Sequence, residues 1–176
     1  MENNSRRGFM GIAFGAVAGI GAVGSLYAMK KSWDPLPSVK AAGFTTLDMT
    51  TYNENELVVE KWRGKPIFVL KLTSEMLETI KDKQNDMERL IKIGDSHFMV
   101  TLGLCTHLGC IPGYNPADKT FLCACHGGMY DVTGDVTKAP PPRGLDIPPF
   151  KIKGNLLVLG EVSDQYKAMK ENGITL

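Results

Sequence analysis

The sequence predicts a mainly β head domain that comes after a single transmembrane helix at the amino terminus. Residues 8–29 contain no charged side chain, and β-branched and aromatic runs separated by turn residues make up much of the remaining chain. All four cysteines and two of the three histidines fall between Cys105 and His126. A chain of 176 residues has room for one ordinary domain with a short appendage. Its net charge of +1 gives no reason to expect a nucleic-acid partner.

The amino-terminal segment 1–29 is expected to combine an export signal with a membrane anchor. Residues 9–28 form an apolar run of 20, about the length that a helix needs to cross a bilayer. Arg6 and Arg7 precede it in S-R-R-G-F-M, which resembles the twin-arginine signal of proteins that fold and take up cofactors before export. A cleaved signal peptide is the alternative. Leu26-Tyr27-Ala28 has a small residue only at its last position, so we expect a retained, single-pass anchor.

This anchor predicts a location at a bacterial inner membrane, with the amino terminus in the cytoplasm and the head in the periplasm. Residues 30–43 contain Pro35 and Pro37, few apolar residues and no clear period, which predicts a flexible linker. That linker is either a hinge or a passive spacer. The head is expected to cover residues 44–176.

The head is predicted to contain short strands with one or two inserted helices. β-branched and aromatic runs indicate the strands, while Met, Leu and Ile at helical spacing indicate the helices. Arg63-Gly64-Lys65 is a hairpin signal, and Ser74 could cap a helix. The expected elements are strands at 56–62, 66–72, 98–104 and 155–159, helices at 74–83 and 86–93, and a solvated helix or tail at 161–176.

Two loops in the centre of the chain pair cysteine with histidine. They read C-T-H-L-G-C over residues 105–110 and C-A-C-H-G-G over residues 123–128. Cysteine and histidine at this density indicate a metal. Cys-x-His followed by Cys-x-x-His is the spacing of a Rieske two-iron two-sulfur centre, where His replaces Cys on one iron. The two remaining cysteines, Cys110 and Cys125, could then form a disulfide.

Two other interpretations of these loops stay open from the residues alone. One is a zinc site, and the other is a pair of plain disulfides with unliganded histidines. The third histidine, His97, lies outside both loops. It is expected to be an ordinary surface or strand-end residue.

The motifs resemble those of the Rieske iron-sulfur subunit of respiratory cytochrome bc complexes, the quinol-cytochrome c reductases, in their bacterial form. The resemblance extends to K-W-R-G-K-P at residues 61–66, to Ala139-Pro140-Pro141-Pro142, and to the anchor and linker. It implies an antiparallel β head of the Rieske type with a small cluster-binding subdomain at about residues 101–148. It also implies one [2Fe-2S] cluster as cofactor.

The resemblance further implies a role for each of these side chains. Cys105 and Cys123 would ligate the inner iron through their thiolates, and His107 and His126 would ligate the outer iron through their imidazoles. The remaining implied roles are a disulfide between Cys110 and Cys125, a hydrogen bond from His126 to the quinol, an apolar collar that includes Leu108, and a shielding loop of Pro140, Pro141 and Pro142.

One position departs from the pattern of many high-potential members of the family. They carry a serine that donates a hydrogen bond to a bridging sulfide, where this chain has Gly128, while a tyrosine that bonds a ligand sulfur is retained as Tyr130. Because hydrogen bonds to the sulfurs favour the reduced cluster, we expect a low potential and a low-potential quinol such as menaquinol. Replacing Gly128 by serine is then expected to raise the potential. The alternative is that Gly128 only suits a turn, with a water molecule as donor.

The resemblance implies an electron-transfer subunit of a proton-translocating redox enzyme. It would take an electron, with a proton, from a quinol bound on cytochrome b and pass it to a c-type cytochrome by movement of the head, within a dimeric complex. The first alternative is the small Rieske subunit of a periplasmic molybdenum enzyme such as arsenite oxidase. The second is a zinc-binding structural module without a redox role.

Overall fold

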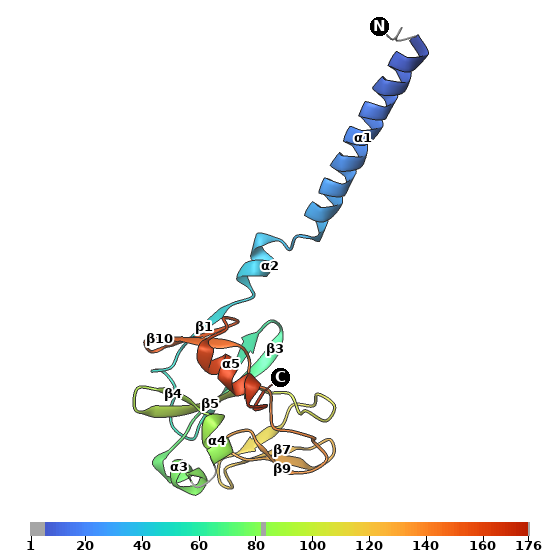
Figure 1. Ribbon diagram of the computed structural model, residues 1–176. Coiled ribbons are helices and arrows are strands. Elements are labelled where there is room, and N and C mark those ends of the chain that lie inside the picture. Colours follow the sequence, from blue (N-terminus) through green and yellow to red (C-terminus); the bar gives the residue numbers. More distant parts are fainter. Residues whose placement is uncertain (1–5, 82–83, 176) are drawn as a thin grey trace. The chain divides into compact units, whose positions relative to one another are not determined.

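The computed structural model describes residues 6–81 and 84–175 and divides into two compact units, which meet in the chain between Ala41 and Ala42 (Figure 1). The first unit contains helix α1, Arg6–Trp33, whose 28 residues extend about 42 Å at 1.5 Å per residue. None of its side chains is buried. By length and composition it could cross a membrane, whose hydrocarbon core is about 30 Å thick.

The segment 30–43, which is expected to be a flexible linker, contains two helical stretches. Its first residues, Lys30 to Trp33, continue α1, and Pro37–Ala41 forms the short helix α2. Proline at the first position of a helix is favourable, since its fixed φ suits the helix and its missing N–H would be unpaired there. The backbone N–H groups of Val39 and Lys40 both donate to the Leu36 carbonyl. Within the described residues, only 34–36 and 42–43 of the segment remain outside helices.

The head unit contains three antiparallel sheets. The first has the order β1-β11-β10, with β1 at Thr45–Asp48, β11 at Leu156–Leu159 and β10 at Phe150–Lys153. The second has the order β2-β3-β5-β4, with β2 at Leu57–Trp62, β3 at Lys65–Lys71, β5 at Ser96–Leu102 and β4 at Ile91–Ile93. The third has the order β6-β7-β8-β9, with β6 at Gly113–Asn115, β7 at Thr120–Cys123, β8 at Gly128–Tyr130 and β9 at Val136–Lys138.

Strands β3 and β5 of the sheet β2-β3-β5-β4 have buried side chains on both faces, so this sheet lies between two cores of the head. Side chains alternate along β3, so Ile67 and Val69 join the core shared with the first sheet. Phe68 and Leu70 join the core shared with the third sheet, where Phe68 stacks on Phe121 at 5.7 Å between ring centroids. The continuous apolar run of β3 is explained by these two cores, since every position from Ile67 to Leu70 is buried. The third sheet therefore packs against one face of β3.

The sequence-based expectation of a helix over 86–93 is wrong for its second half. Helix α4, Gln84–Glu88, ends early, and Ile91–Ile93 forms strand β4, which pairs with β5 across a turn at Gly94 with φ 60°. Ile91 and Ile93 are both buried, as alternate residues of a strand are, and this burial prevails over the helical spacing of the apolar residues. The preceding helix α3, Ser74–Ile80, is capped by Thr73 and not by Ser74, which is its first residue. Residues 82–83, the last two of the helix expected over 74–83, lie outside the described residues.

The end of the chain is not simply solvated. Helix α5, Asp164–Glu171, begins after the cap Ser163 and buries Tyr166 and Met169 in the core of the first two sheets. The expected strand at 98–104 is also displaced, because β5 already begins at Ser96.

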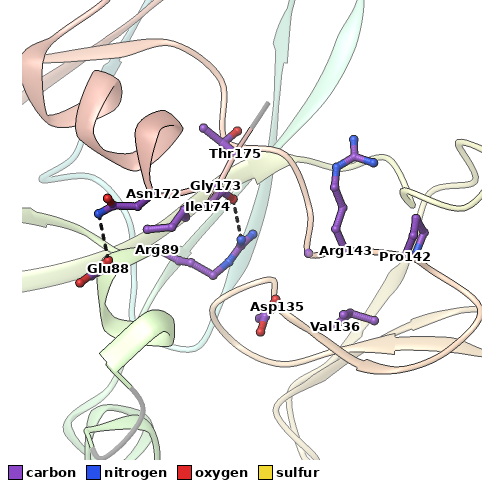
Figure 2. Close-up of a pocket in the computed structure, with 11 residues that line it drawn as sticks. Glu88, Arg89, Asp135, Val136, Pro142, Arg143, Asn172, Gly173, Ile174 and Thr175 are labelled. Carbon is purple, nitrogen blue, oxygen red and sulfur yellow. Dashed lines mark hydrogen bonds between the residues drawn. The ribbon is translucent and has the colours of Figure 1, made fainter.

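Arg89 joins three distant parts of the head, as Figure 2 shows for its contact with the carboxyl-terminal segment. Its side chain is only 5% exposed and lines a pocket of about 780 Å³. The guanidinium donates to the Ile174 carbonyl at 2.9 Å and to the Thr133 carbonyl at 3.2 Å, and it also bonds the carbonyls of Gly134 and Leu145. Burial lowers its pKa, although several nearby carboxylates oppose this. A buried cation of this kind is tolerated because its donors are paired.

We predict that Arg89→Met destabilises the head by about 3 kcal/mol, because buried carbonyls that accept from the guanidinium lose their donor. Unfolding of the detergent-solubilised chain in guanidinium chloride measures the effect as a shift of the denaturation midpoint. Lys138→Met removes an exposed cation from β9 and should change the stability by no more than about 0.5 kcal/mol. Equal midpoints for Arg89→Met and the unsubstituted protein would contradict the prediction.

Candidate metal centre

The two cysteine-histidine loops lie at one end of the third sheet. Loop 1, residues 105–110, connects β5 with β6, and loop 2, residues 123–128, connects β7 with β8. Both loops close in the same way, since the N–H of Gly109 donates to the Cys105 carbonyl at 2.8 Å and that of Gly127 to the Cys123 carbonyl at 2.9 Å. Both glycines have positive φ, 81° and 75°, a conformation that other residues rarely adopt. Glycine four residues after each of these cysteines therefore permits the turn.

A disulfide between Cys110 and Cys125 links the two loops, with a Cα–Cα distance of 6.7 Å. The sulfurs of Cys110, Cys123 and Cys125 lie within 4.8 Å of one another, but a sulfur in a disulfide is not available as a thiolate ligand. The free thiols of the centre are therefore Cys105 and Cys123, and both are buried.

The two histidines of the loops face each other. Their ring centroids are 4.7 Å apart and the rings are nearly perpendicular, at 87°. The Nδ1 atom of His107 is buried and has no hydrogen-bond partner among the residues that the structure describes, which is costly for a polar atom. A metal ion would remove that cost by accepting the lone pair of this nitrogen. Two buried thiols and two adjacent imidazoles make a donor set that fits the mixed sulfur and nitrogen ligation of a [2Fe-2S] cluster with two histidines.

Tyr130 lies beneath loop 1 and donates a hydrogen bond to the Cys105 sulfur, with an Oη–Sγ distance of 3.1 Å. Its side chain is fully buried, and burial, with the bond to Cys105, raises its pKa to about 12. The hydroxyl therefore stays protonated and remains a donor at neutral pH. The backbone N–H of Thr106 donates to the same Tyr130 oxygen at 3.1 Å, while the Thr106 hydroxyl donates to the Arg143 carbonyl at 2.6 Å. Sequence reasoning found Tyr130 but missed Thr106.

The two free thiols differ in their ionisation. Burial alone raises the pKa of Cys105, but the hydrogen bonds from the Tyr130 hydroxyl and from backbone N–H groups of its own loop hold that pKa below its ordinary value. The pKa of Cys123 is raised by burial and by the neighbouring Cys105 sulfur. The Tyr130 hydroxyl and the backbone N–H groups of loop 1 therefore favour the thiolate form of Cys105.

Gly128 lies against the proline loop, residues 139–142, which follows β9. A Cβ atom at Gly128 would lie 2.5 Å and 2.6 Å from the Cδ and Cγ atoms of Pro141. Real Cβ atoms do not approach other atoms so closely, so a serine at position 128 fits only if Pro141 moves. Gly128→Ser, which is expected to raise the potential, would therefore also disturb the packing of Pro141. The ring of Pro141 occupies the place that a side chain of residue 128 would take.

Two other residues considered in the sequence analysis, Leu108 and His97, lie in different surroundings. Leu108 is 71% exposed at the surface of loop 1, and Ile111, which sequence reasoning missed, is 62% exposed just after it. His97 is half-buried in β5 opposite Lys92 and is not part of the two loops. Burial, with the positive charge of Lys92, lowers the pKa of His97.

We predict that Cys110→Ser with Cys125→Ser lowers the unfolding free energy by about 3 kcal/mol, since the bond spans 15 residues and restricts the unfolded chain. Chemical denaturation followed by the fluorescence of buried Trp62 measures this loss. Dithiothreitol serves as the control, because it should lower the midpoint of the unsubstituted protein and leave that of the variant unchanged. A variant as stable as the oxidised parent would contradict this account.

Comparison with known proteins agrees with this geometry. The model of the Rieske [2Fe-2S] domain family matches residues 50–151. The chain is similar to a ubiquinol-cytochrome c reductase iron-sulfur subunit of Rickettsia conorii, with 34% identity over 85% of this chain and 89% of that one. It is also similar to the subunit of that name from Bradyrhizobium diazoefficiens, with 32% identity over 85% of this chain and 90% of that one.

Among solved structures, a chain of a hyperthermophilic respiratory complex III is 34% identical, with a TM-score of 0.57. The match covers 84% of this chain and 98% of that chain. These relatives favour a respiratory subunit over the small subunit of a molybdenum enzyme, and the family's cofactor favours iron and sulfide over zinc. The chain belongs to the Rieske [2Fe-2S] family.

Proposed function

We propose that the chain is the electron-transfer subunit of a quinol-cytochrome c reductase, a proton-translocating complex of the respiratory chain. The observation that carries the proposal is a pair of buried free thiols beside two histidines, at an end of the head that also exposes large apolar side chains. The relatives named as iron-sulfur subunits of this enzyme, which match most of the chain, support it.

In this proposal the thiolates of Cys105 and Cys123 and the imidazoles of His107 and His126 hold the cluster. The cluster supplies a site that takes up and releases one electron. The buried Nδ1 of His107 is the nitrogen that would bind metal, which leaves its Nε2 free to exchange a proton. Tyr130 keeps its hydroxyl proton directed at the Cys105 sulfur and stabilises negative charge there.

The exposed end of the head fits a docking site for quinol on cytochrome b. His126 is exposed, and its imidazole can form a hydrogen bond with a quinol hydroxyl. Leu108 of loop 1 and Ile111, which follows that loop, are exposed apolar side chains that would exclude water when the head docks. We propose that the same end then delivers the electron to a c-type cytochrome.

The orientation in the membrane is also a proposal. Arg6 and Arg7 precede the apolar part of α1, and Lys30 and Lys31 follow it, so the number of basic residues does not by itself distinguish the two ends. The twin-arginine pattern at Arg6 and Arg7 favours a cytoplasmic amino terminus, a retained anchor and a periplasmic head at the bacterial inner membrane. Ser5 of that pattern lies outside the described residues.

Movement of the head requires a tether, for which residues 34–42 are the best candidate. The next residue, Gly43, belongs to the head, because its carbonyl accepts from Trp62 Nε1 at 2.9 Å and from Arg63 Nε at 3.3 Å. Short irregular pieces flank α2, at residues 34–36 and at Ala42. We propose that these pieces absorb the rotation, in a dimeric complex as the family resemblance implies.

A low-potential quinol such as menaquinol fits the absence of a side-chain donor at Gly128. Hydrogen bonds to the sulfurs of a Rieske cluster favour its reduced form, and such clusters span about −150 to +300 mV. Tyr130 supplies one such bond. We place the potential toward the lower part of this range.

The histidines provide the sharpest test of the function. His107→Gln and His126→Gln should each abolish the low-average-g electron paramagnetic resonance signal of the reduced cluster, because glutamine does not replace imidazole as a ligand. Quinol-dependent reduction of cytochrome c by membranes should fall to background in both. His97→Gln is the matched control and should retain signal and turnover. Normal turnover in either loop variant would contradict the proposal, as would zinc in place of iron in the purified protein.

Tyr130→Phe should lower the midpoint potential by several tens of millivolts, because it removes a hydrogen bond to a charged sulfur and 59 mV corresponds to about 1.4 kcal/mol for one electron. A redox titration followed by the reduced-state signal measures the shift. The control is Tyr114→Phe, since the Tyr114 hydroxyl bonds Asn55 instead. Equal shifts in both variants would mean that the bond to Cys105 has no special effect.

A further inference from the structure

Gly128 stands directly opposite Cys123 in the pairing of β7 with β8. Directly opposite residues of an antiparallel pair project to the same face, with Cβ atoms about 4.5–5.5 Å apart. A side chain at position 128 would therefore share a face with the Cys123 thiol. Position 128 is thus a natural place for a group that controls the surroundings of that sulfur.

Pro141 occupies this place. Its Cδ and Cγ atoms lie 2.5 Å and 2.6 Å from where a Cβ of residue 128 would be, and both Pro141 and Gly128 are buried. Pro140 and Pro142, its neighbours in the loop, are exposed. Pro141 is therefore the buried proline of the three, although all three lie next to one another in the sequence.

The proline loop is also held from its far side, so the ring cannot simply retreat. The Arg143 carbonyl accepts from the Thr106 hydroxyl of loop 1 at 2.6 Å. The Arg143 guanidinium makes a two-pronged contact with the Asp146 carboxylate, at 2.8 Å and 3.0 Å from Nη2 to the two oxygens. These bonds begin two residues after Pro141 and limit its displacement.

We propose that Pro141 is a positioning residue for the cluster potential. Its ring takes the place opposite Cys123, requires glycine at position 128, and thereby excludes a side-chain hydroxyl that could donate to the sulfurs of the cluster from this position. Proline is suited to this task because its ring and its backbone nitrogen both lack a donor. Fewer donors at the sulfurs disfavour the reduced cluster. This inference rests on the role of Cys123 as a ligand in the proposed function.

The test uses the full chain, solubilised in detergent with its cluster inserted. The variants are Gly128→Ser, Pro141→Ala, the double variant with both changes, and Gly128→Ala with Pro141→Ala, which has the extra Cβ without a hydroxyl. Pro142→Ala is the matched control, since it removes an exposed ring from the same loop. Melting temperature, iron content per chain and midpoint potential are measured for each.

Gly128→Ser alone should lower the melting temperature and the iron content, because its Cβ meets the Pro141 ring. Adding Pro141→Ala should restore at least half of both losses, which is a coupling that two unrelated positions would not show. The midpoint of this double variant should then exceed that of Gly128→Ala with Pro141→Ala, since only serine brings a donor. Pro142→Ala should match the unsubstituted protein in all three measurements.

Two results would overturn the inference. One is Gly128→Ser with unchanged melting temperature and iron content, because the ring would then not restrict position 128. The other is equal midpoints for the serine and alanine double variants, both carrying a full cluster, because donors at this place would then not affect the potential. Neither result touches the proposed function, which fails separately if the unsubstituted chain shows no Rieske signal.

Discussion

The disulfide between Cys110 and Cys125 is the constraint on which the rest of the centre depends. Four cysteines in two short loops could ligate a metal in several combinations, and the bond removes two of them from the choice. It leaves Cys105 and Cys123 as the free thiols, both buried, and it joins the loops that carry His107 and His126. The mixed donor set therefore results from a covalent bond between residues that need not touch the metal.

Loop 1, loop 2 and the proline loop surround the centre, and each of them contacts the other two. Loop 1 is joined to loop 2 by the disulfide, and to the proline loop by the bond from the Thr106 hydroxyl to the Arg143 carbonyl. Loop 2 contacts the proline loop where Gly128 meets Pro141. Because each segment is fixed by both of the others, the donors at the sulfurs are preorganised and need little rearrangement when the charge of the centre changes.

Sequence reasoning succeeded where the signal is local. The cysteine and histidine spacing lies within two short loops, and the apolar runs that became β2 and β3 needed no distant contact to be recognised. It failed at 86–93, where Met87, Leu90 and Ile91 have helical spacing but pairing with β5 makes Ile91–Ile93 a strand. It also missed Pro141 against Gly128, 13 positions apart, because only the path of β8 and β9 brings them together.

The centre is polarised between a buried side and an exposed side, and this division separates two properties. On the buried side, the thiols contact each other, and Cys105 accepts from the Tyr130 hydroxyl. Apolar side chains such as Phe121 and Leu145 lie in the same core. On the exposed side lie His126 and the apolar surface of Leu108. Hydrogen-bond donors near sulfur influence the potential of a Rieske cluster, whereas in the proposed function the contact with quinol would be made by the exposed imidazole surface. Under that proposal, substitutions on the buried side would adjust the potential while the exposed surface stays the same.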